Sequence, residues 1–334
     1  MASVGERPSI AIALGDPAGI GPEIAIKAGF DPQVRALCRP ILVGHESVVR
    51  FYIERLNPSI RLRRIADAAE AGAEPDMLDL LPAKADALGG WAPGRIDAAC
   101  GRAALAYAGQ SIDLASAGQV HAVVAGPHNQ GAIRAAGIDF DGYPRFVAGR
   151  TGTDPDAVFL MLIGDERRIV HVTLHLGVRA ALEVIRRNRV LGTLRATASA
   201  LRRMGVVRPR IAVSGVNPHA GEGGLFGRDE IDEIVPAIAD ARADGIDADG
   251  PFGADTMLLD RGYDAYVVML HDQGHIPAKL VGFNSTSAMP VGVPVLFASV
   301  AHGSAFDIAG KGIADPACLI RAIGRLIADQ PITH

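Results

Sequence analysis

Three short apolar runs have the length of buried strands, and each is followed within a few residues by a histidine. The runs are residues 169–174, 211–216 and 266–270, and the histidines after them are His175, His219 and His271. Runs this short and rich in β-branched residues are typical of strands inside a sheet. Because ligands of α/β sheets bind beyond the carboxyl ends of the strands, three imidazoles arriving there indicate a metal site.

Strand-like and helix-like segments alternate along most of the chain, which predicts an α/β fold. Residues 9–14 read as a strand, residues 15–23 as a glycine- and proline-rich turn bordering a cleft, and residues 24–28 as the start of a helix. A helix over 46–56, a long helix over 97–117 and a strand over 119–125 continue the pattern. Runs at 157–163 and 168–174 are close enough for an antiparallel hairpin. Three segments read as irregular: an excursion at 66–96, a turn at 139–144 and a flexible loop at 219–224.

Size and composition favour a globular enzyme that acts on small molecules. A chain of 334 residues, 49% of them hydrophobic, is long enough for two domains with substantial cores. A net charge of -4 without a basic tract argues against nucleic-acid and membrane-surface roles. Three cysteines without CxxC spacing indicate a reducing compartment. No stretch reads as a signal peptide or membrane span, so we expect a cytoplasmic protein.

The segment after the third run concentrates groups that carry chemistry. Within HDQGHIPAKL, His271 is followed by Asp272, His275 and Lys279. Three neutral imidazoles suit zinc first, with manganese, cobalt, nickel or magnesium as alternatives. A lone histidine at a strand end is more often structural, but three at equivalent positions favour the metal. Asp272 and Asp255 are candidates to orient the ligand rings through their second nitrogens.

Five motifs in the same order resemble the 4-hydroxythreonine-4-phosphate dehydrogenase family, from about residue 9 to residue 328. They are GDPAGIGPEI, VNPHAGEGG, PFGADT, MLHDQG and HGSAFDIAGKGIADP. The last of them looks like the adenosine-binding loop of isocitrate and isopropylmalate dehydrogenases. The resemblance implies that superfold: two α/β domains flanking a central cleft, with a non-Rossmann NAD site. We place the nucleotide-binding domain at 1–127 with 280–334, and the metal, substrate and dimerisation domain at 128–279.

The resemblance also implies cofactors and a partner. It implies a divalent metal on His175, His219 and His271, the last contributed by the partner subunit of a homodimer whose active site is shared. It further implies NAD or NADP along the loop. The cofactor-binding candidates are His302, Gly303, Ser304, Ala305, Asp307 and Asp315. Lys279, Asp255 and Asp272 are the catalytic candidates, with Lys279 binding a carboxylate or transferring a proton.

Departures from the family pattern point to the substrate. Enzymes acting on phosphorylated hydroxythreonine carry Gly-His-Thr-Glu where this chain has Gly142-Tyr143-Pro144-Arg145, and their phosphate-binding Asn and Arg align with Ala288 and Phe297. A phosphate dianion without its arginine would be poorly compensated. The replacements look like those of terephthalate dihydrodiol dehydrogenase, a branch of the same family.

That branch implies oxidation of a cis-dihydrodiol dicarboxylate with loss of CO₂, giving a catechol acid such as protocatechuate. Tyr143, Phe297, Ala288 and Ile276 are expected to wall a ring. The substrate-binding candidates are Tyr143, Arg145, His128, His275 and Asn217. The alternative is a dehydrogenase of 4-phosphohydroxy-L-threonine or a related phosphorylated four-carbon hydroxy acid. A non-catalytic binding protein with the same fold is a further alternative from another class.

Overall fold

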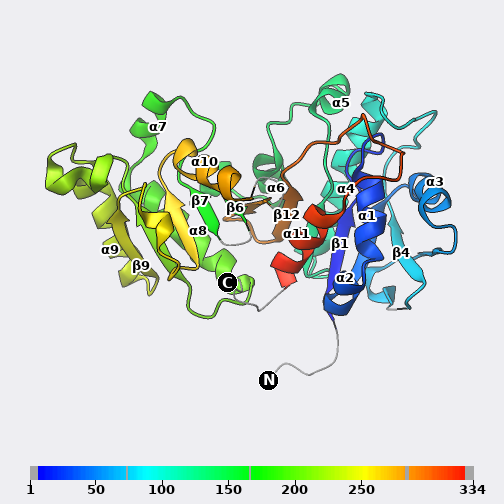
Figure 1. The fold of residues 1–334 in the computed structure, drawn as a ribbon, viewed down its shortest axis with the longest axis horizontal. Coiled ribbons are helices and arrows are strands. Elements are labelled where there is room, and N and C mark those ends of the chain that lie inside the picture. The colour runs from blue at the N-terminus through cyan, green and yellow to red at the C-terminus, as the bar shows by residue number, and fades with distance from the viewer. Residues whose placement is uncertain (1–6, 73, 165–166, 283–285, 328–334) are drawn as a thin grey trace. The chain divides into compact units, whose positions relative to one another are not determined.

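The chain forms two compact units, and the strands of the sheet are divided between them (Figure 1). The computed structural model describes residues 7–72, 74–164, 167–282 and 286–327. Among the described residues, unit 1 covers 7–151 and 294–327, and unit 2 covers 152–293. We expected the divisions after 127 and 279. The first division falls later because α5 (Gln130–Ala135) and α6 (Tyr143–Thr151) pack on α4 (Ala98–Ser116), which belongs to unit 1. The second falls later because β11 (Ser287–Val291) pairs with β6 (Phe159–Ile163) of unit 2.

The sheet of unit 1 is parallel throughout. Its strands, in spatial order, are β3 (Arg61–Arg64), β4 (Met77–Pro82), β2 (Arg39–Gly44), β1 (Ser9–Ala13), β5 (Ala122–Ala125) and β12 (Leu296–Val300). All five residues of β1 are buried, as expected for a central strand covered on both faces. The segment 66–96, expected to be irregular, contains β4. Its Asp79 is buried against Arg63, with 2.6 Å between Oδ1 and Nε.

Two groups of helices pack on this sheet. One consists of α1 (Gly21–Gly29), α2 (Pro32–Leu37), α3 (Glu46–Leu56) and α11 (Ala317–Ile327), and the other of α4 with α5 and α6. An N-cap explains where α4 begins: the Asp97 carboxylate accepts a hydrogen bond from the Ala99 amide at 2.7 Å. The expected turn at 139–144 runs into α6, because Pro144 lies in the first helical turn, where no amide donor is needed.

The sheet of unit 2 is mixed. Its order is β11 (Ser287–Val291), β6 (Phe159–Ile163), β7 (Arg168–His171), β10 (Ala265–Val268), β8 (Arg210–Ser214) and β9 (Asp247–Phe252). β6 is antiparallel to both β11 and β7, which confirms the expected hairpin. β7, β10, β8 and β9 run parallel to one another.

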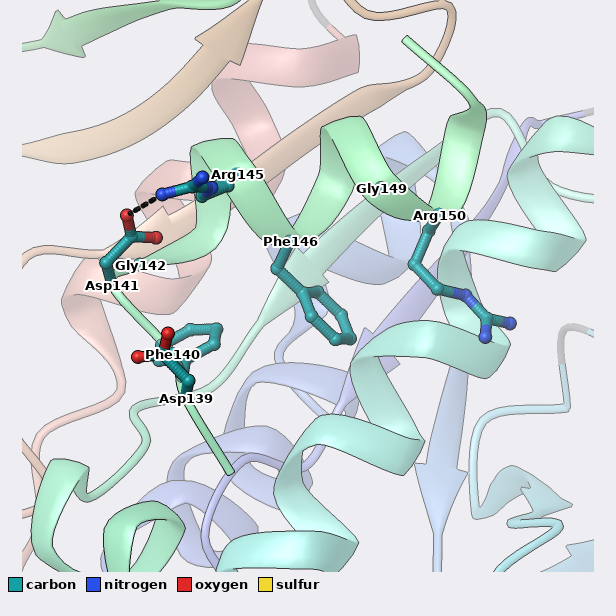
Figure 2. A pocket seen from close by; sticks show the side chains of 8 residues that line it. All are labelled: Asp139, Phe140, Asp141, Gly142, Arg145, Phe146, Gly149 and Arg150. Carbon is teal, nitrogen blue, oxygen red and sulfur yellow. Dashed lines mark hydrogen bonds and ion pairs between the residues drawn. The ribbon is translucent and has the colours of Figure 1, made fainter. Parts of the chain in front are cut away.

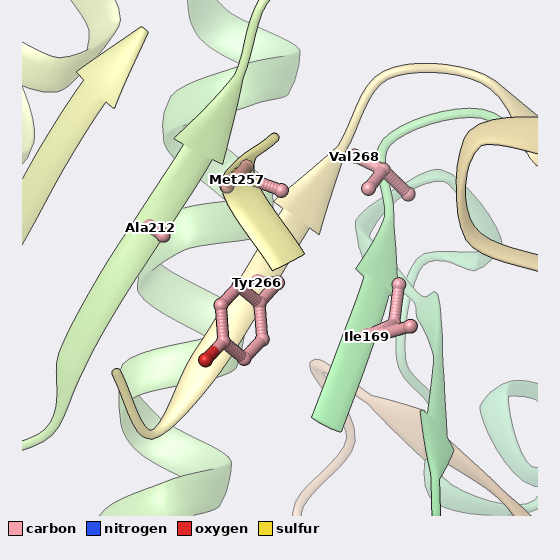
Figure 3. Close-up of a cluster of buried hydrophobic side chains, with 5 residues drawn as sticks. All are labelled: Ile169, Ala212, Met257, Tyr266 and Val268. Carbon is pink, nitrogen blue, oxygen red and sulfur yellow. The ribbon is translucent and has the colours of Figure 1, made fainter. Parts of the chain in front are cut away.

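Helices and short turns complete unit 2. They are α7 (Val178–Val184), α8 (Arg187–Arg203), α9 (Val235–Ala243) and α10 (His271–Gly282), the 3₁₀ segments Pro155–Ala157, Pro218–Gly224 and Met257–Leu259, and a π-helical turn at Glu230–Ile234. A fourth 3₁₀ turn, Ala68–Glu70, lies in unit 1. Figure 3 shows the buried cluster under the parallel strands: Ile169, Ala212, Met257, Tyr266 and Val268. This apolar packing holds the strands that carry the histidine segments.

Candidate functional site

The three histidine segments leave neighbouring parallel strands. β10 pairs with β7 on one side and with β8 on the other, so the carboxyl ends of these strands lie at one edge of the sheet. The strands end earlier than expected, at His171, Val268 and Ser214. His271 consequently opens helix α10 instead of closing a strand. The placement of three histidine-bearing segments at one edge agrees with the sequence pattern.

Four imidazoles gather at this edge. The His175 and His271 ring centroids are 5.9 Å apart. His271 stacks on His275, with 3.8 Å between centroids and nearly parallel planes. The Nδ1 atom of His275 lies 3.0 Å from Nε2 of His171. His171, which is buried, also bonds the Leu160 carbonyl at 3.2 Å, which indicates a structural role.

Burial keeps two members of this group uncharged at neutral pH. Desolvation, followed by the neighbouring His275, lowers the pKa of His171 to about 3. Desolvation and then His271 lower the pKa of His275 to about 4. His275, expected to meet a substrate carboxylate, therefore offers a neutral ring that is stacked and hydrogen-bonded inside the group. It lacks the positive charge that would attract a carboxylate.

The catalytic candidates lie at the surface of unit 2. The Asp272 Oδ1 atom is 2.6 Å from His271 Nδ1, the arrangement in which a carboxylate fixes the tautomer of an imidazole. Lys279 is exposed on α10, and Asp255 is exposed just before the Met257–Leu259 turn. No contact between Asp255 and a histidine ring is seen within the described part of the chain. Orientation by a carboxylate is thus visible at His271 only.

His219 lies in a left-handed turn instead of the expected flexible loop. Residues 219–223 all have positive φ, from 44° at Glu222 to 80° at Gly221. For His219, Ala220 and Glu222 this conformation costs about 1–2 kcal/mol per residue. Such strain persists only where the surroundings hold the backbone in place, and it clusters at functional sites.

The histidine set suits a divalent cation chemically, but one chain does not assemble it. Over the described residues, no three His, Cys, Asp or Glu side chains are placed as a metal site. The rings of His175 and His271 approach each other, whereas the His219 ring faces Phe226 at 6.2 Å between centroids. With Nδ1 of His271 directed at Asp272, Nε2 is the ring nitrogen that would be available to a cation. The donor chemistry fits, and a shared site between two copies is compatible with this geometry.

The loop after β12 in unit 1 is fixed at two points. The Ser304 carbonyl accepts the Ile20 amide at 2.9 Å, and its hydroxyl accepts the Asn129 side-chain amide at 3.3 Å. Gly19 permits this approach, because a Cβ there would lie 2.7 Å from the Ser304 Cβ. Ala305 has a φ of 40°, and the Asp315 carboxylate accepts the Ala317 amide at 2.9 Å to begin α11.

The remaining loop candidates differ in exposure. Gly303, Asp307 and Asp315 are exposed and can face a ligand. His302 is half-buried, and its hydrogen bond to Cys318 raises the pKa of the imidazole above its ordinary value. The loop backbone is therefore held by hydrogen bonds, while its exposed backbone and polar side chains can face a ligand.

We expected the turn at 15–23 to border a cleft, but Glu23 and Asp16 lie in the interior of unit 1. Both are completely buried. Glu23 pairs with Lys27 at 2.8 Å and accepts the amides of Gly312 and Ala314 at 3.2 and 2.8 Å. The sequence pattern did not predict this role of Glu23. The i,i+4 spacing between Glu23 and Lys27 in α1 could have predicted their ion pair.

The substrate candidates of unit 1 form an aromatic group beside an open pocket. Tyr143 lies 5.0 Å from His128 and 4.8 Å from Phe297, measured between ring centroids. Its hydroxyl is buried and has no hydrogen-bond partner within the described structure. Phe297 is fully buried, so these two rings pack on one another in the interior instead of forming exposed walls. Burial lowers the pKa of His128, which keeps that imidazole neutral.

Arg145 lines a pocket of about 390 Å³ on the surface of unit 1 (Figure 2). The other lining residues are Asp139, Phe140, Asp141, Gly142, Phe146, Gly149 and Arg150. Arg145 forms an exposed ion pair with Asp141 at 3.1 Å, and such pairs contribute little energy. Its guanidinium can therefore exchange Asp141 for an incoming anion.

A family model described as pyridoxal phosphate biosynthetic protein PdxA matches residues 36–325. The chain belongs to the PdxA family. It is 42% identical over 323 residues to 1,2-dihydroxy-3,5-cyclohexadiene-1,4-dicarboxylate dehydrogenase of a Comamonas species, covering 96% of this chain and 98% of that one. It is 38% identical over 325 residues to D-threonate 4-phosphate dehydrogenase of Cupriavidus necator, with 95% of each chain covered.

Solved structures agree with the family assignment. The structure of a 4-hydroxythreonine-4-phosphate dehydrogenase from Burkholderia phymatum superposes with a TM-score of 0.87 at 35% identity, covering 98% of this chain and 100% of that one. The α/β fold class and the family resemblance expected from the motifs are thereby confirmed. Like these relatives, this PdxA-family protein is a dehydrogenase. None of its described helices is both long and apolar enough to cross a bilayer.

Proposed function

We propose that this PdxA-family dehydrogenase oxidises a cis-dihydrodiol dicarboxylate with NAD or NADP and a divalent metal. Hydride leaves the carbon bearing one hydroxyl for the nicotinamide, and the hydroxyl proton is released. The β-keto acid formed loses CO₂, and the ring becomes aromatic as a catechol acid such as protocatechuate. Two kinds of relative, dihydrodiol and phosphorylated hydroxy-acid dehydrogenases, make the choice between substrates the central question.

The position of Phe297 favours a dicarboxylate substrate over a phosphorylated one. It aligns with the phosphate-binding arginine of the hydroxythreonine enzymes, yet it is a fully buried residue of β12 packed against Tyr143. A guanidinium at this position would have to lie in an apolar interior, where an unpaired charge is strongly disfavoured. The absence of that cation favours a substrate whose anionic groups are carboxylates held elsewhere.

The polar groups of unit 1 offer such positions. The Tyr143 hydroxyl is a buried donor without a partner in the described structure, and a ligand oxygen would satisfy it. Arg145 supplies a planar pair of donors, the geometry that suits a carboxylate. Together with His128 we assign these groups to the substrate. Asn217 in unit 2 has both amide hydrogens directed at Asp229 and Glu230, so we assign it to holding its own turn.

The metal would be held by His175 and His219 together with His271 of the partner subunit. When bound, it supplies a Lewis acid that lowers the pKa of the substrate hydroxyl. Asp272 fixes the ring of His271 through Nδ1. Lys279, eight residues further along α10, binds a carboxylate or holds the proton needed after CO₂ departs, and Asp255 assists the ligand rings.

NAD or NADP would lie along the loop at 302–315. The buried hydroxyl of Ser304 fixes the loop, while exposed Gly303, Asp307 and Asp315 face the nucleotide. His302 and Ala305 shape its first turn, and Asp315 additionally begins α11. The fixed backbone limits the ordering cost on binding.

A second copy is the partner that we propose for unit 2. Helix α7 buries only Ala181, and its Val178 and Leu182 side chains are 65% and 40% exposed. Leu225 and Phe226, beside the His219 turn, are also exposed. Exposed apolar groups of this kind mark interaction surfaces. A homodimer covering them would bring the partner's His271 to the incomplete metal site.

One substrate panel separates the two candidate functions. Purified protein is offered terephthalate and phthalate cis-dihydrodiols, 4-phosphohydroxy-L-threonine and D-threonate 4-phosphate, each with NAD and with NADP, and with and without a chelator. We expect nicotinamide reduction and a catechol acid from a dihydrodiol, abolished by the chelator. Turnover of only the phosphorylated acids would refute the proposal and establish the rival, and binding of neither cofactor would favour a non-catalytic protein.

A further inference from the structure

Two side chains outside the expected site lock the segments that carry His219 and His271. Glu230 is buried in the π-helical turn and accepts the backbone amides of Val216 and Asn217, each at 2.8 Å. It also accepts the Asn217 side-chain amide at 2.9 Å. These bonds hold the backbone immediately before the left-handed turn that contains His219.

Gln273 performs the corresponding task for His271. Its Oε1 accepts the amides of Met269 and Leu270 at 3.0 and 2.9 Å, which fixes the backbone just before His271. Its Nε2 donates to the Gly215 carbonyl at 3.1 Å. One side chain therefore joins the start of α10 to the loop that follows β8.

Gly215 contacts both side chains, Glu230 and Gln273. A Cβ on Gly215 would lie 2.9 Å from Glu230 Oε1 and 2.7 Å from the Ala220 Cα. A Cβ on Gly221 would lie 2.6 Å from Glu230 Oε2. The glycines let the carboxylate lie directly against the strained turn, and this close packing explains how three non-glycine residues are kept in a left-handed conformation.

We propose that Glu230 and Gln273 are positioning residues for metal binding: Glu230 holds the His219 segment for the metal site of its own subunit, and Gln273 holds the His271 segment for the metal site that it shares with the partner subunit. The inference rests on the proposed function, since it assigns these histidines to a metal. Neither side chain is itself a ligand: each acts through backbone amides. Supporting groups around metal ligands change metal affinity by about 10- to 100-fold when removed.

Zinc titration of the full-length apoprotein tests this proposal. Affinity is measured by competition with a fluorescent zinc chelator for the wild type, Glu230→Gln, Gln273→Met, His219→Ala and the control Asp232→Asn. Asp232 lies in the same π-helical turn but is exposed and pairs with Arg228. We expect about a tenfold loss of zinc affinity in Glu230→Gln and Gln273→Met, a larger loss in His219→Ala, and wild-type affinity in the control.

A fifth variant separates loss of positioning from loss of stability. Ala220→Gly relieves the left-handed strain, so it should raise the melting temperature while loosening His219 and weakening zinc binding several-fold. Folded Glu230→Gln, Gln273→Met and Ala220→Gly proteins that bind zinc as tightly as the wild type, while His219→Ala does not, would overturn the positioning roles alone. A wild type that binds no zinc would overturn the metal function and these roles together.

Discussion

The buried carboxylate of Glu23 accepts a 2.8 Å hydrogen bond from the backbone amide of Ala314, joining the first helix to the end of the proposed nucleotide loop. Lys27, one helical turn later, bonds the carbonyls of Gly312 and Ala314 at 3.0 and 2.7 Å. The Glu23–Lys27 ion pair thus bonds both the backbone amides and the backbone carbonyls of Gly312 and Ala314. The loop is consequently fixed at this end whether or not a nucleotide is present.

Glu23→Gln should weaken nucleotide binding without unfolding the protein. The amide retains one acceptor but loses the charge, and a hydrogen bond to a charged group contributes about 1.5–3 kcal/mol. We expect a roughly tenfold higher Kd for NAD or NADP by calorimetry, together with faster hydrogen exchange at 312–314. Glu46→Gln, which breaks the exposed pair with Arg50, serves as the control. Unchanged affinity in Glu23→Gln would show that this anchor is irrelevant to the ligand.

Asp16→Asn should stabilise the protein at pH 7.5 more than at pH 4. Desolvation raises the pKa of Asp16 from 3.8 to about 6, opposed by the Ala18 amide. Because the folded pKa exceeds the unfolded one, the contribution of Asp16 to stability is complete below pH 3.8 and is lost as pH rises through 6. At about 1.4 kcal/mol per pH unit, the difference is at most about 3 kcal/mol.

Urea unfolding of the wild type and Asp16→Asn at both pH values measures this difference. The exposed Asp86→Asn is the matched control, expected to show no pH-dependent change. An Asp16→Asn effect of equal size at the two pH values would contradict the raised pKa.

Removal of metal should abolish turnover reversibly. Dialysis against a chelator is expected to lower the activity at least tenfold, and zinc or manganese should restore it, because the proposed ligands are three imidazoles. His175→Ala and His271→Ala should each lose bound metal by elemental analysis, whereas the exposed His121→Ala should retain it. Full metal content in both site variants would place the metal elsewhere.

Arg145→Ala should raise KM for a dicarboxylate dihydrodiol about tenfold and leave KM for the nucleotide unchanged. Among the described residues, the guanidinium pairs with exposed Asp141 alone, so its loss costs little stability. Steady-state kinetics with each substrate varied separately gives both constants. Arg102→Ala, exposed on α4, is the control. Equal KM values for Arg145→Ala and the wild type would remove this residue from the substrate site.

Much of the fold could be predicted because its strands are apolar and its helices are regularly patterned. The helix at 46–56 has the predicted bounds, and the three histidine segments follow neighbouring strands. Strand β4 was missed because Asp79 interrupts its apolar pattern. In the folded chain that charge is neutralised by Arg63, a pairing between strands that a linear reading does not reveal.

The supports of the site were harder to predict than its exposed groups. Histidines are recognised by residue type. Glu23 and Glu230 instead accept backbone amides at least 13 residues away, and Gln273 joins its own segment to the distant Gly215 carbonyl. The turn at His219 illustrates the same limit. Its glycines indicate a bend, but the left-handed conformation of Ala220 and Glu222 depends on packing against Glu230.

The interior position of Phe297 has a consequence for how substrate preference changes in such enzymes. Exchanging it for arginine alone would place a cation among packed rings with no counter-ion, so the expected result is an unstable protein and not a new activity. Under the proposed function, a change to phosphorylated substrates would require Tyr143 and its aromatic neighbours to change together with position 297. A single substitution there is therefore expected to be insufficient to exchange one substrate class for the other.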